Sequence, residues 1–396
     1  MKKEWKDRQV LQVQSDKKFI TPDGEVYGYD IDMLGSLKDR YLYLGADVTF
    51  VQFGMPVSKS TASNMINLTE KGFKVIPVKY CLTPQTYKNR PSTKKIIFEA
   101  VRTCDILIAR MPGLLSYMAQ EAAIKLGKPY IVEMVGCTWD ALWNYSKLSK
   151  LYAPIAFFNC KKSVAKAEYV TYVTTNFLQK RYPNSNKTCS LSDVVLQEVS
   201  TNRILKKMDS LLRKKNNYSI TTLAGVDVLY KGQHFVIEAI ARLKKKGYNL
   251  EYHVAGAGDP TRLKNIAERF DVADRIKFTG MLNTNQLFEL LDKTDIYIQP
   301  SEQEGLPRSV VEAMSRGCVC VGSNTGGIPE LLDAICIFRK GNVKQITSLL
   351  ETLLKDKKFL LQQSKTNFEK AKQFNRSLLE KKRRDFYDEF INNNFE

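Results

Sequence analysis

Two glutamates lie eight positions apart where a predicted loop leads into a predicted helix. Glu304 precedes the helix, and Glu312 lies inside it, among the apolar residues of Ser-Val-Val-Glu-Ala-Met. Pro307 suits a first helical position, so the N–H groups of Gly305 and Leu306 would be unpaired at the helix start and could hold a phosphate. A carboxylate among apolar neighbours needs hydrogen-bond donors, and sugar hydroxyls would supply them without a metal. The pattern therefore predicts a site for a compound that carries phosphate and sugar.

A lysine and several glycines also follow predicted strands in this half of the chain. In an open parallel sheet, ligands bind beyond the carboxyl ends of the strands, so these positions are expected to converge on one edge. Lys231 is a mobile charge that could reach phosphate oxygens there, although alone it would be taken for a surface lysine. Gly256 could equally serve close packing of strand against helix. The residues that follow successive strands are Gly225 and Lys231, Gly256 and Gly258, Gly280 and Leu282, Glu304, and 324–330.

Short apolar runs alternate with amphipathic stretches along the whole chain, which is typical of βα units around parallel sheets. The sequence therefore predicts the α/β class. In the first half, strands are expected at 10–13, 48–53, 106–109, 130–134 and 169–173. In the second half, they are expected at 219–223, 250–255, 276–279, 296–299 and 319–321.

A break in this pattern divides the chain into two domains. Turn residues fill 182–193, and a basic helix at 203–215 follows, which sets the boundary between 195 and 217. The expected parts are a first domain at 1–200, a linker at 201–217, a second domain at 218–375 and a last helix at 376–396. Ser377 and Glu380 predict a capping box for that helix. Its apolar residues share one side and could dock on a neighbouring surface: Leu379, Phe386 and Phe390.

The chain has 396 residues and a formal net charge of +19, spread over both halves. Such a charge favours polyanionic partners, but no nucleic-acid-binding motif accompanies it, so no nucleic-acid partner is expected. The start is charged and no apolar window is long enough to span a membrane, which favours a cytoplasmic protein with at most peripheral, electrostatic contact with an anionic membrane. Eight cysteines without a Cys-x-x-Cys pair are expected to be reduced and structural.

Taken together, residues 219–335 resemble the nucleotide-sugar domain of the retaining family-4 glycosyltransferases. The resemblance is carried by an ordered set of motifs: Lys231-Gly232, Gly256-x-Gly258, Glu304-x7-Glu312 and Thr325-Gly-Gly-Ile-Pro-Glu330. It implies a GT-B fold, in which two Rossmann-like domains with parallel sheets face a central cleft and a C-terminal helix packs back towards the first domain.

The resemblance also implies an activity. The chain would move a hexosyl group from a nucleotide-diphosphate sugar to a hydroxyl acceptor, with the anomeric configuration retained, without a metal and without a cofactor. The acceptor would be a glycan, a lipid-linked precursor or another cell-envelope polysaccharide precursor at the inner face of the cell membrane.

Site roles follow from the resemblance residue by residue. Glu304 and Lys231 would be catalytic, with Glu304 on the donor-sugar hydroxyls and Lys231 on the diphosphate. Glu312 would bind the ribose, Leu282 the base region, and the N–H groups of Gly305 and Leu306 the diphosphate. The remaining donor-binding positions are Gly225, Gly256, Gly280 and, from the opposing domain, Gly28.

Two departures from the family pattern leave roles open. Many relatives carry an arginine after the glycine of the first loop, where this chain has Val226; Arg308 could replace that charge or make an ordinary surface contact.

Many relatives also carry a histidine near the reacting sugar, but both histidines of this chain lie in the second half, where a structural role is expected. Asp140 could take part of that task. Arg110 could contact acceptor or phosphate, or form a structural ion pair.

Other interpretations stay open at this point. Asp30-Ile-Asp32 imitates a metal-binding pair of the other main glycosyltransferase fold, but Asp30 is better explained as a helix cap, so no metal site is predicted. A nucleotide-sugar epimerase or phosphorylase on a similar fold would need acid and base groups near the sugar. A non-catalytic polyanion-binding protein would account for the charge alone.

Overall fold

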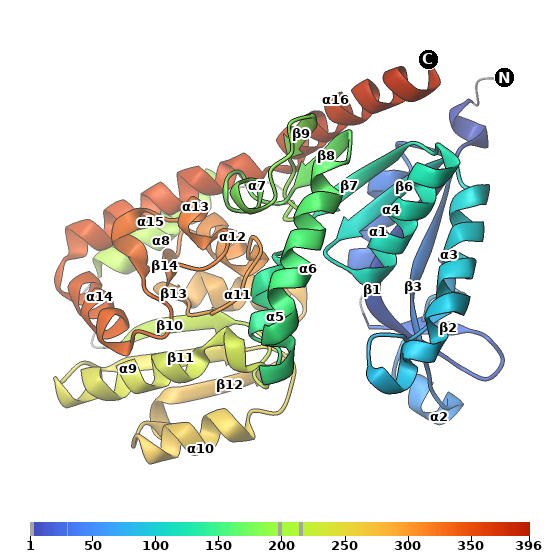
Figure 1. The fold of residues 1–396 in the computed structure, drawn as a ribbon. Helices are drawn as coiled ribbons and strands as arrows, with labels where there is room; N and C mark the ends of the chain where they lie inside the picture. The colour runs from blue at the N-terminus through green and yellow to red at the C-terminus, as the bar shows by residue number, and fades with distance from the viewer. Residues whose placement is uncertain (1–3, 30, 197–199, 214–216) are drawn as a thin grey trace.

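The computed structural model describes residues 4–396 except 30, 197–199 and 214–216. Figure 1 shows two α/β domains side by side, with the last helix crossing the top of the view toward the first domain. The predicted class is confirmed, because each domain is built on a parallel sheet with helices on its faces.

The first domain has a parallel sheet in the order β5-β3-β1-β6-β7-β8-β9. Its strands are β1 (Gln9–Ile20), β3 (Asp47–Pro56), β5 (Lys74–Lys79), β6 (Ile106–Met111), β7 (Tyr130–Met134), β8 (Tyr169–Tyr172) and β9 (Lys187–Ser190). Two short antiparallel strands extend it, β2 (Val26–Gly28) and β4 (Ile66–Asn67). Its helices are α1 (Ile31–Tyr41), α2 (Lys59–Ala62), α3 (Arg90–Thr103), α4 (Leu114–Leu126), α5 (Thr138–Trp143), α6 (Lys147–Ala165) and α7 (Phe177–Arg181).

The second domain has a fully parallel sheet in the order β12-β11-β10-β13-β14-β15. Its strands are β10 (Tyr218–Leu223), β11 (Leu250–Ala255), β12 (Ile276–Gly280), β13 (Ile296–Gln299), β14 (Val319–Ser323) and β15 (Ile337–Phe338). Its helices are α8 (Thr201–Leu212), α9 (Gln233–Lys245), α10 (Thr261–Arg269), α11 (Thr284–Lys293), α12 (Arg308–Ser315), α13 (Ile328–Leu331), α14 (Val343–Lys355) and α15 (Lys357–Ala371). Strands β13 and β14 are buried along their whole length, which explains their unbroken apolar runs.

The segment expected as a linker is largely a helix of the second domain. Ile204 and Leu211 of α8 are buried, and Lys207 lies against the same domain, where its Nζ donates to the carbonyl oxygens of Leu291 and Thr294 at 3.0 and 2.6 Å. The described part of the connection between the domains is therefore short, around Leu196.

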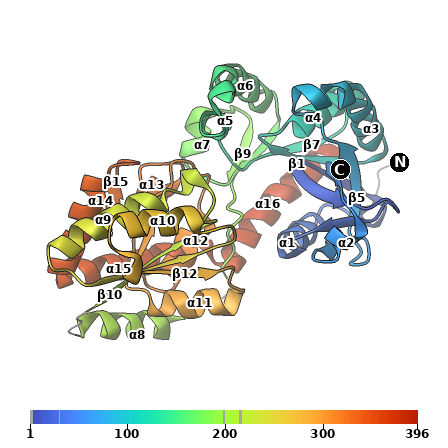
Figure 2. The same ribbon diagram turned by 90° about the horizontal axis from the view of Figure 1, so that it is seen from below.

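The last helix, α16 (Arg376–Phe395), returns to the first domain (Figure 2). Its N-cap is Asn375, whose side chain accepts from the Ser377 N–H at 3.1 Å, so the predicted capping box at Ser377 is wrong. Asn375 satisfies the first-turn N–H and leaves Ser377 inside the helix. The expected docking does occur: Phe386 and Phe390 pack in the core of the first domain, against Tyr169 at ring distances of 5.7 and 5.0 Å.

The two chain crossings between the domains lie next to each other. The N–H of Leu196 donates to the Phe374 carbonyl at 2.9 Å, and the N–H of Arg376 donates to the Leu196 carbonyl at 3.0 Å. All eight cysteines are free thiols. Among the residues described, no helix combines the length and apolar character that crossing a bilayer requires.

Candidate functional site

Lys231 and Glu304 form an ion pair at the carboxyl edge of the second sheet. Lys231 follows β10 and Glu304 follows β13, the strand paired with β10, and their Nζ and Oε1 atoms are 2.7 Å apart. Both side chains are largely buried, with Glu304 only 9% exposed. Gln299 at the end of β13 donates from Nε2 to the same Oε1 at 3.0 Å. Two donors thus orient one carboxylate oxygen, and Oε2 has no hydrogen-bond partner within the described part of the chain.

A second layer of hydrogen bonds holds Gln299 in place. Its Oε1 accepts from the Tyr297 hydroxyl at 2.5 Å and from the Ser309 hydroxyl at 3.2 Å. Its Nε2 also donates to the Ser301 hydroxyl at 2.9 Å. Because Tyr297, Gln299 and Ser301 are buried, this network is rigid and fixes the Glu304 carboxylate.

The turn that carries Lys231 depends on a glycine. Gly232 has a φ of +73°, and a Cβ there would lie 2.2 Å from the Pro300 carbonyl oxygen. No other residue lets the turn after β10 approach the loop after β13 so closely, and this approach brings Lys231 to Glu304.

Glu312 lies on α12, one turn after Arg308. Burial raises the pKa of its carboxyl above the usual range, and the charge of Arg308 offsets part of that rise. No donor among the described residues forms a hydrogen bond with this carboxylate. Arg308 is exposed and is the first residue of α12, with Pro307 as the N-cap rather than the first helical residue. The charge of Arg308 therefore stabilises the ionised form of the Glu312 carboxyl.

We expect the Glu312→Gln variant to unfold at a higher temperature than the wild type at pH 7. The raised pKa means that the folded state prefers the protonated carboxyl, so stability falls as the pH rises from the pKa of the unfolded state to that of the folded state and stays lower above it. Calorimetric melting of both proteins without ligand at pH 7 and near pH 4 measures this. The gain should shrink at the lower pH, and an equal or lower melting temperature at pH 7 would contradict it.

The loop after Glu304 lies against the first domain. A Cβ on Gly305 would be 2.6 Å from the Val135 carbonyl oxygen, just beyond β7. Leu306 packs against the cores of both domains, and Asn144 Nδ2 lies 3.4 Å from Gln303 Oε1. The predicted phosphate loop therefore closes the cleft between the domains as well as flanking Glu304.

Glu330 joins the domains and was given no role from the sequence. Its carboxylate accepts from four donors of the first domain at the start of α7: the Thr175 N–H at 2.6 Å and hydroxyl at 2.7 Å, and the N–H groups of Asn176 at 3.0 Å and Phe177 at 2.5 Å. The sequence marked Glu330 in one way, by its position at the end of the Thr-Gly-Gly-Ile-Pro-Glu motif. The residue acts as a helix cap supplied across the cleft.

Arg110 does not face the cleft. Its guanidinium is buried and donates to Glu133 Oε2 at 2.8 Å and to Asp193 Oδ2 at 2.7 Å, and Arg40 also binds Asp193. Although burial alone would raise the pKa of Asp193, the two arginines hold it far below its usual range. The structure thus favours the structural ion pair over the acceptor contact for Arg110.

The other candidates of the first domain occupy different surroundings. Asp140 lies in α5, near the cleft, and pairs with Arg181 Nη1 at 3.2 Å. Gly28 is buried in β2, where it pairs with Ile66 of β4. Asp30 lies outside the described residues.

The remaining donor-side positions line the same sheet edge. The Gly225 carbonyl accepts from Gln233 Nε2 at 2.9 Å, and a Cβ on Gly256 would lie 2.0 Å from the Ala224 carbonyl, so Gly256 serves close packing. Gly280 has a φ of +70° and open space around it, and Leu282 is partly buried against the second core.

A positive charge that the sequence analysis missed lies at this edge. Arg262, at the start of α10, is close enough to Asp227 for its charge to be felt there, and its Nε and Nη2 atoms are buried without a hydrogen-bond partner in the described part of the chain. It stands two strands from Glu304, beside the loop that carries Val226. No signal in the sequence marked it, because the two loops are far apart along the chain.

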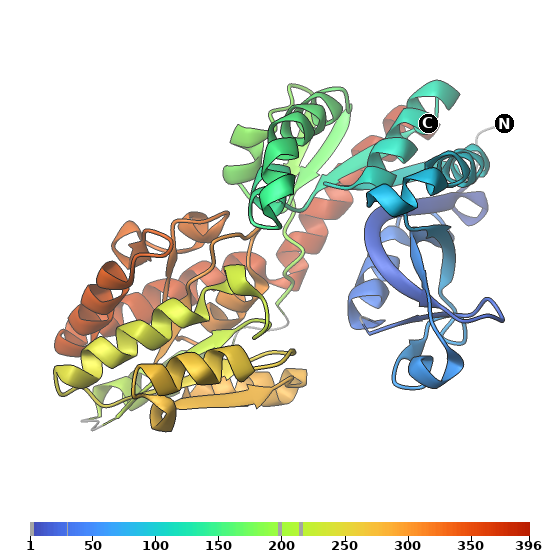
Figure 3. The ribbon, with the colours of Figure 1, turned by 60° about the horizontal axis from the view of Figure 1, so that its bottom comes forward.

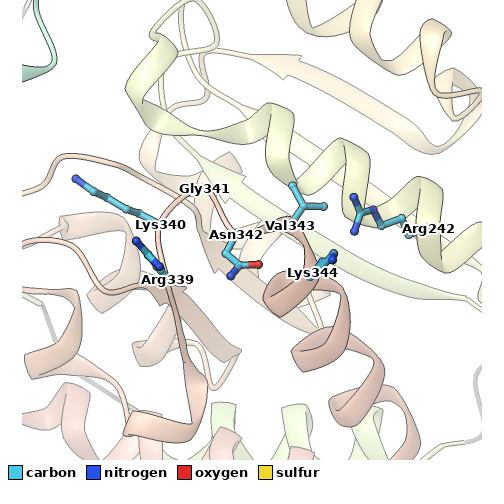
Figure 4. Close-up of a pocket in the computed structure, with 7 residues that line it drawn as sticks. All are labelled: Arg242, Arg339, Lys340, Gly341, Asn342, Val343 and Lys344. Atoms are coloured by element: carbon cyan, nitrogen blue, oxygen red, sulfur yellow. The ribbon is translucent and has the colours of Figure 1, made fainter.

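The surroundings of the edge are basic. An open hollow of about 510 Å³ follows β15, and Figure 4 shows its four cationic side chains. Such a concentration of charge raises the local concentration of anions. The cationic residues are Arg242, Arg339, Lys340 and Lys344.

Metal ligands and histidines do not gather at the site. Within the described ranges, no three or more His, Cys, Asp or Glu side chains form a group that could hold a metal ion. Burial lowers the pKa of both His234 and His253, and His253 Nε2 lies 3.0 Å from Glu251 Oε1.

Two parallel-sheet domains that meet at the loop after Glu304 make up the GT-B fold class. Solved structures of that class have the same fold. HepE of Anabaena, solved with UDP, aligns with a TM-score of 0.65 at 15% identity over 94% of this chain and 97% of its own. WaaG, a glycosyltransferase involved in lipopolysaccharide biosynthesis, aligns with a TM-score of 0.63 at 15% identity over 95% of this chain and 98% of its own.

The second half of the chain is similar to a known family. Residues 206–372 match the family model described as "Glycosyl transferases group 1". Protein CapJ of Staphylococcus aureus is 27% identical over 341 residues, which cover 84% of this chain and 83% of CapJ. The putative colanic acid biosynthesis glycosyltransferase WcaL of Escherichia coli K12 is 32% identical over 111 residues, which cover 26% of this chain and 27% of WcaL.

Proposed function

We propose that this protein is a retaining, metal-independent hexosyltransferase. It moves a sugar from a nucleotide-diphosphate sugar to a hydroxyl of a lipid-linked or other cell-envelope polysaccharide precursor, at the inner face of the cell membrane. The observation that carries the proposal is the buried Lys231–Glu304 pair at a sheet edge closed by the opposing domain. The names of WcaL and of HepE solved with UDP-glucose support the same substrate class.

In the proposed reaction, the Glu304 carboxylate orients the donor sugar. Oε1 is held by Lys231 and Gln299, so the other oxygen accepts from sugar hydroxyls. Lys231 shares its charge with the diphosphate as the bond between the anomeric carbon and the phosphate oxygen breaks. The N–H groups of Gly305 and Leu306 stabilise the same oxygens. The departing diphosphate takes the acceptor proton while the acceptor oxygen bonds to the anomeric carbon on the same face, so the configuration is kept.

The site contributes positioning and prearranged charge rather than a nucleophile. Glu304 Oε1 is engaged by two donors and its carboxylate is fixed by a buried network, which suits orientation. Donors and cations that need no rearrangement stabilise the developing charge of the leaving group.

A panel of nucleotides tests the proposed function most directly. We expect one of UDP, GDP, ADP or CMP to raise the melting temperature clearly more than the others, because a ligand that binds only the folded state stabilises it by RT ln(1 + [L]/Kd). Transfer from the matching nucleotide sugar, with product configuration read by NMR, then tests retention. The absence of a shift with every nucleotide would contradict the proposal and favour the polyanion-binding alternative.

We expect transfer to survive chelation. Lys231 and the loop N–H groups supply the charge neutralisation that a divalent cation supplies elsewhere, so EDTA should leave the initial rate within about twofold of the untreated enzyme. Rates are compared after dialysis against EDTA and again after addition of magnesium. Loss of transfer with EDTA and its return with magnesium would show that a metal site exists, with Asp30 and Asp32 the first positions to examine.

A further inference from the structure

Helix α6 carries a continuous stripe of apolar side chains that face solvent. Its members recur at spacings of three and four, which places them on one side of a helix. On the opposite side, Ala153, Cys160 and Val164 are buried, and the last two belong to the core of the first domain. We call the exposed set the α6 stripe, and its members with their exposed fractions are Leu148 (76%), Leu151 (76%), Tyr152 (51%), Ile155 (57%) and Phe158 (57%).

The charged side chains within the segment that carries the α6 stripe have one sign. Residues 141–167 contain no Asp or Glu and five lysines. All five lysines are exposed, and Lys150 lies over the ring of Trp143, which is itself 40% exposed. The segment therefore combines exposed apolar side chains with lysines that form no ion pair within the described part of the chain. The five are Lys147, Lys150, Lys161, Lys162 and Lys166.

The helix is at the rim of the cleft. Figure 2 shows α5 and α6 at one edge of the molecule, projecting from the first domain, and Figure 3 shows them above the second domain. Asn144, between the two helices, lies within 3.4 Å of Gln303 in the loop next to Glu304. A surface bound by the α6 stripe would therefore lie beside the entrance to the candidate site.

We propose that the α6 stripe docks on an anionic lipid bilayer, with its apolar side chains among the acyl chains and its lysines at the headgroups. Apolar and cationic residues on one helix are the chemistry by which a helix lies in a membrane interface. A second copy fits poorly, because pairing two stripes would bring ten lysines together without an acidic partner from residues 141–167. The inference deepens the proposed function and rests on its placement at the membrane, because it names the surface that binds; bilayer binding itself needs no catalysis.

The proposal changes what the sequence led us to expect. Binding that is purely electrostatic would disappear at high salt. Apolar side chains inserted in the bilayer would stay bound, because salt does not screen the hydrophobic effect. Binding should then need anionic lipid for most of its strength but keep a salt-resistant part.

The test is sedimentation of the full chain with phosphatidylcholine vesicles, with and without phosphatidylglycerol, at low and high salt. The stripe variant is Leu151→Gln with Ile155→Gln. The matched control is Leu205→Gln with Leu212→Gln, which lie on α8 and are 63% and 56% exposed. The wild type and the control should bind the anionic vesicles and keep part of that binding at high salt. The stripe variant should lose the salt-resistant part and partition at least about tenfold more weakly.

Three results would overturn the proposal. The stripe variant could bind as the wild type does, or the wild type could lose all binding at high salt. Finally, the wild type could be a dimer and the stripe variant a monomer, with neither binding vesicles. The α6 stripe would then bind a second copy of the chain rather than a bilayer. The nucleotide-induced melting shift of the stripe variant should equal that of the wild type, which separates failure of this proposal from failure of the proposed function.

Discussion

Replacing Glu304 with glutamine is expected to lower the rate of sugar transfer about 100-fold and to leave the affinity for the bare nucleotide diphosphate near that of the wild type. Glutamine keeps the shape of the side chain but removes the charge that pairs with Lys231 and accepts from Gln299. The sugar would then lose its orienting acceptor, while the diphosphate would keep Lys231. Steady-state transfer rates and calorimetric titration with the preferred nucleotide diphosphate measure the two effects.

Glu302→Gln is the matched control for this experiment. Glu302 lies in the same loop, but its side chain takes no part in the Lys231 pair, so transfer should stay near wild type. The Glu312→Gln variant should behave in the opposite way and weaken free nucleotide and donor alike, by about 1 to 3 kcal/mol. Nucleotide affinity lost in Glu304→Gln but kept in Glu312→Gln would reverse the two assignments, and full activity in both variants would refute the site.

The Lys231→Met variant should bind the nucleotide diphosphate about 100-fold more weakly, because a charge-assisted contact with the phosphates contributes roughly 1.5 to 3 kcal/mol. Its transfer rate should fall further, since Glu304 loses its ion-pair partner in a largely buried position. Calorimetric titration at two salt concentrations measures the loss, and the salt dependence of binding should also weaken. Lys264→Met, which removes an exposed charge of α10, is the control. Unchanged diphosphate affinity with reduced transfer would show that Lys231 acts only through Glu304.

The central strands could be predicted from the sequence, whereas several edge strands could not. Strands such as β6 and β13 begin with apolar runs because neighbouring strands and helices cover them. The outer strand β9 has no fully buried residue, and its Lys-Thr-Cys-Ser sequence lies inside a stretch rich in turn residues. Its position is set by pairing with β8, which is tertiary information.

Site residues could be predicted where the position after a strand was enough to place them, and could not where their partners come from a distant segment. Lys231 and Glu304 both follow a strand, and a parallel sheet brings all such positions to one edge. Arg110 follows the strand predicted at 106–109, but in the structure it lies within β6 and forms an ion pair with Asp193, 83 positions away. Leu151 and Ile155 have the spacing of a buried helix face, and only the packing of α6 shows that their side of the helix is uncovered.

The position of α16 has a consequence for the order in which the protein matures on the ribosome. Phe386, Tyr387 and Phe390 complete an apolar face made by strands of the first domain, yet they are translated after the whole second domain. Until they emerge, the nascent first domain exposes Tyr169 and its neighbours on that face. We therefore expect the first domain to reach its native core only once translation of α16 is finished, with the second domain folding ahead of it.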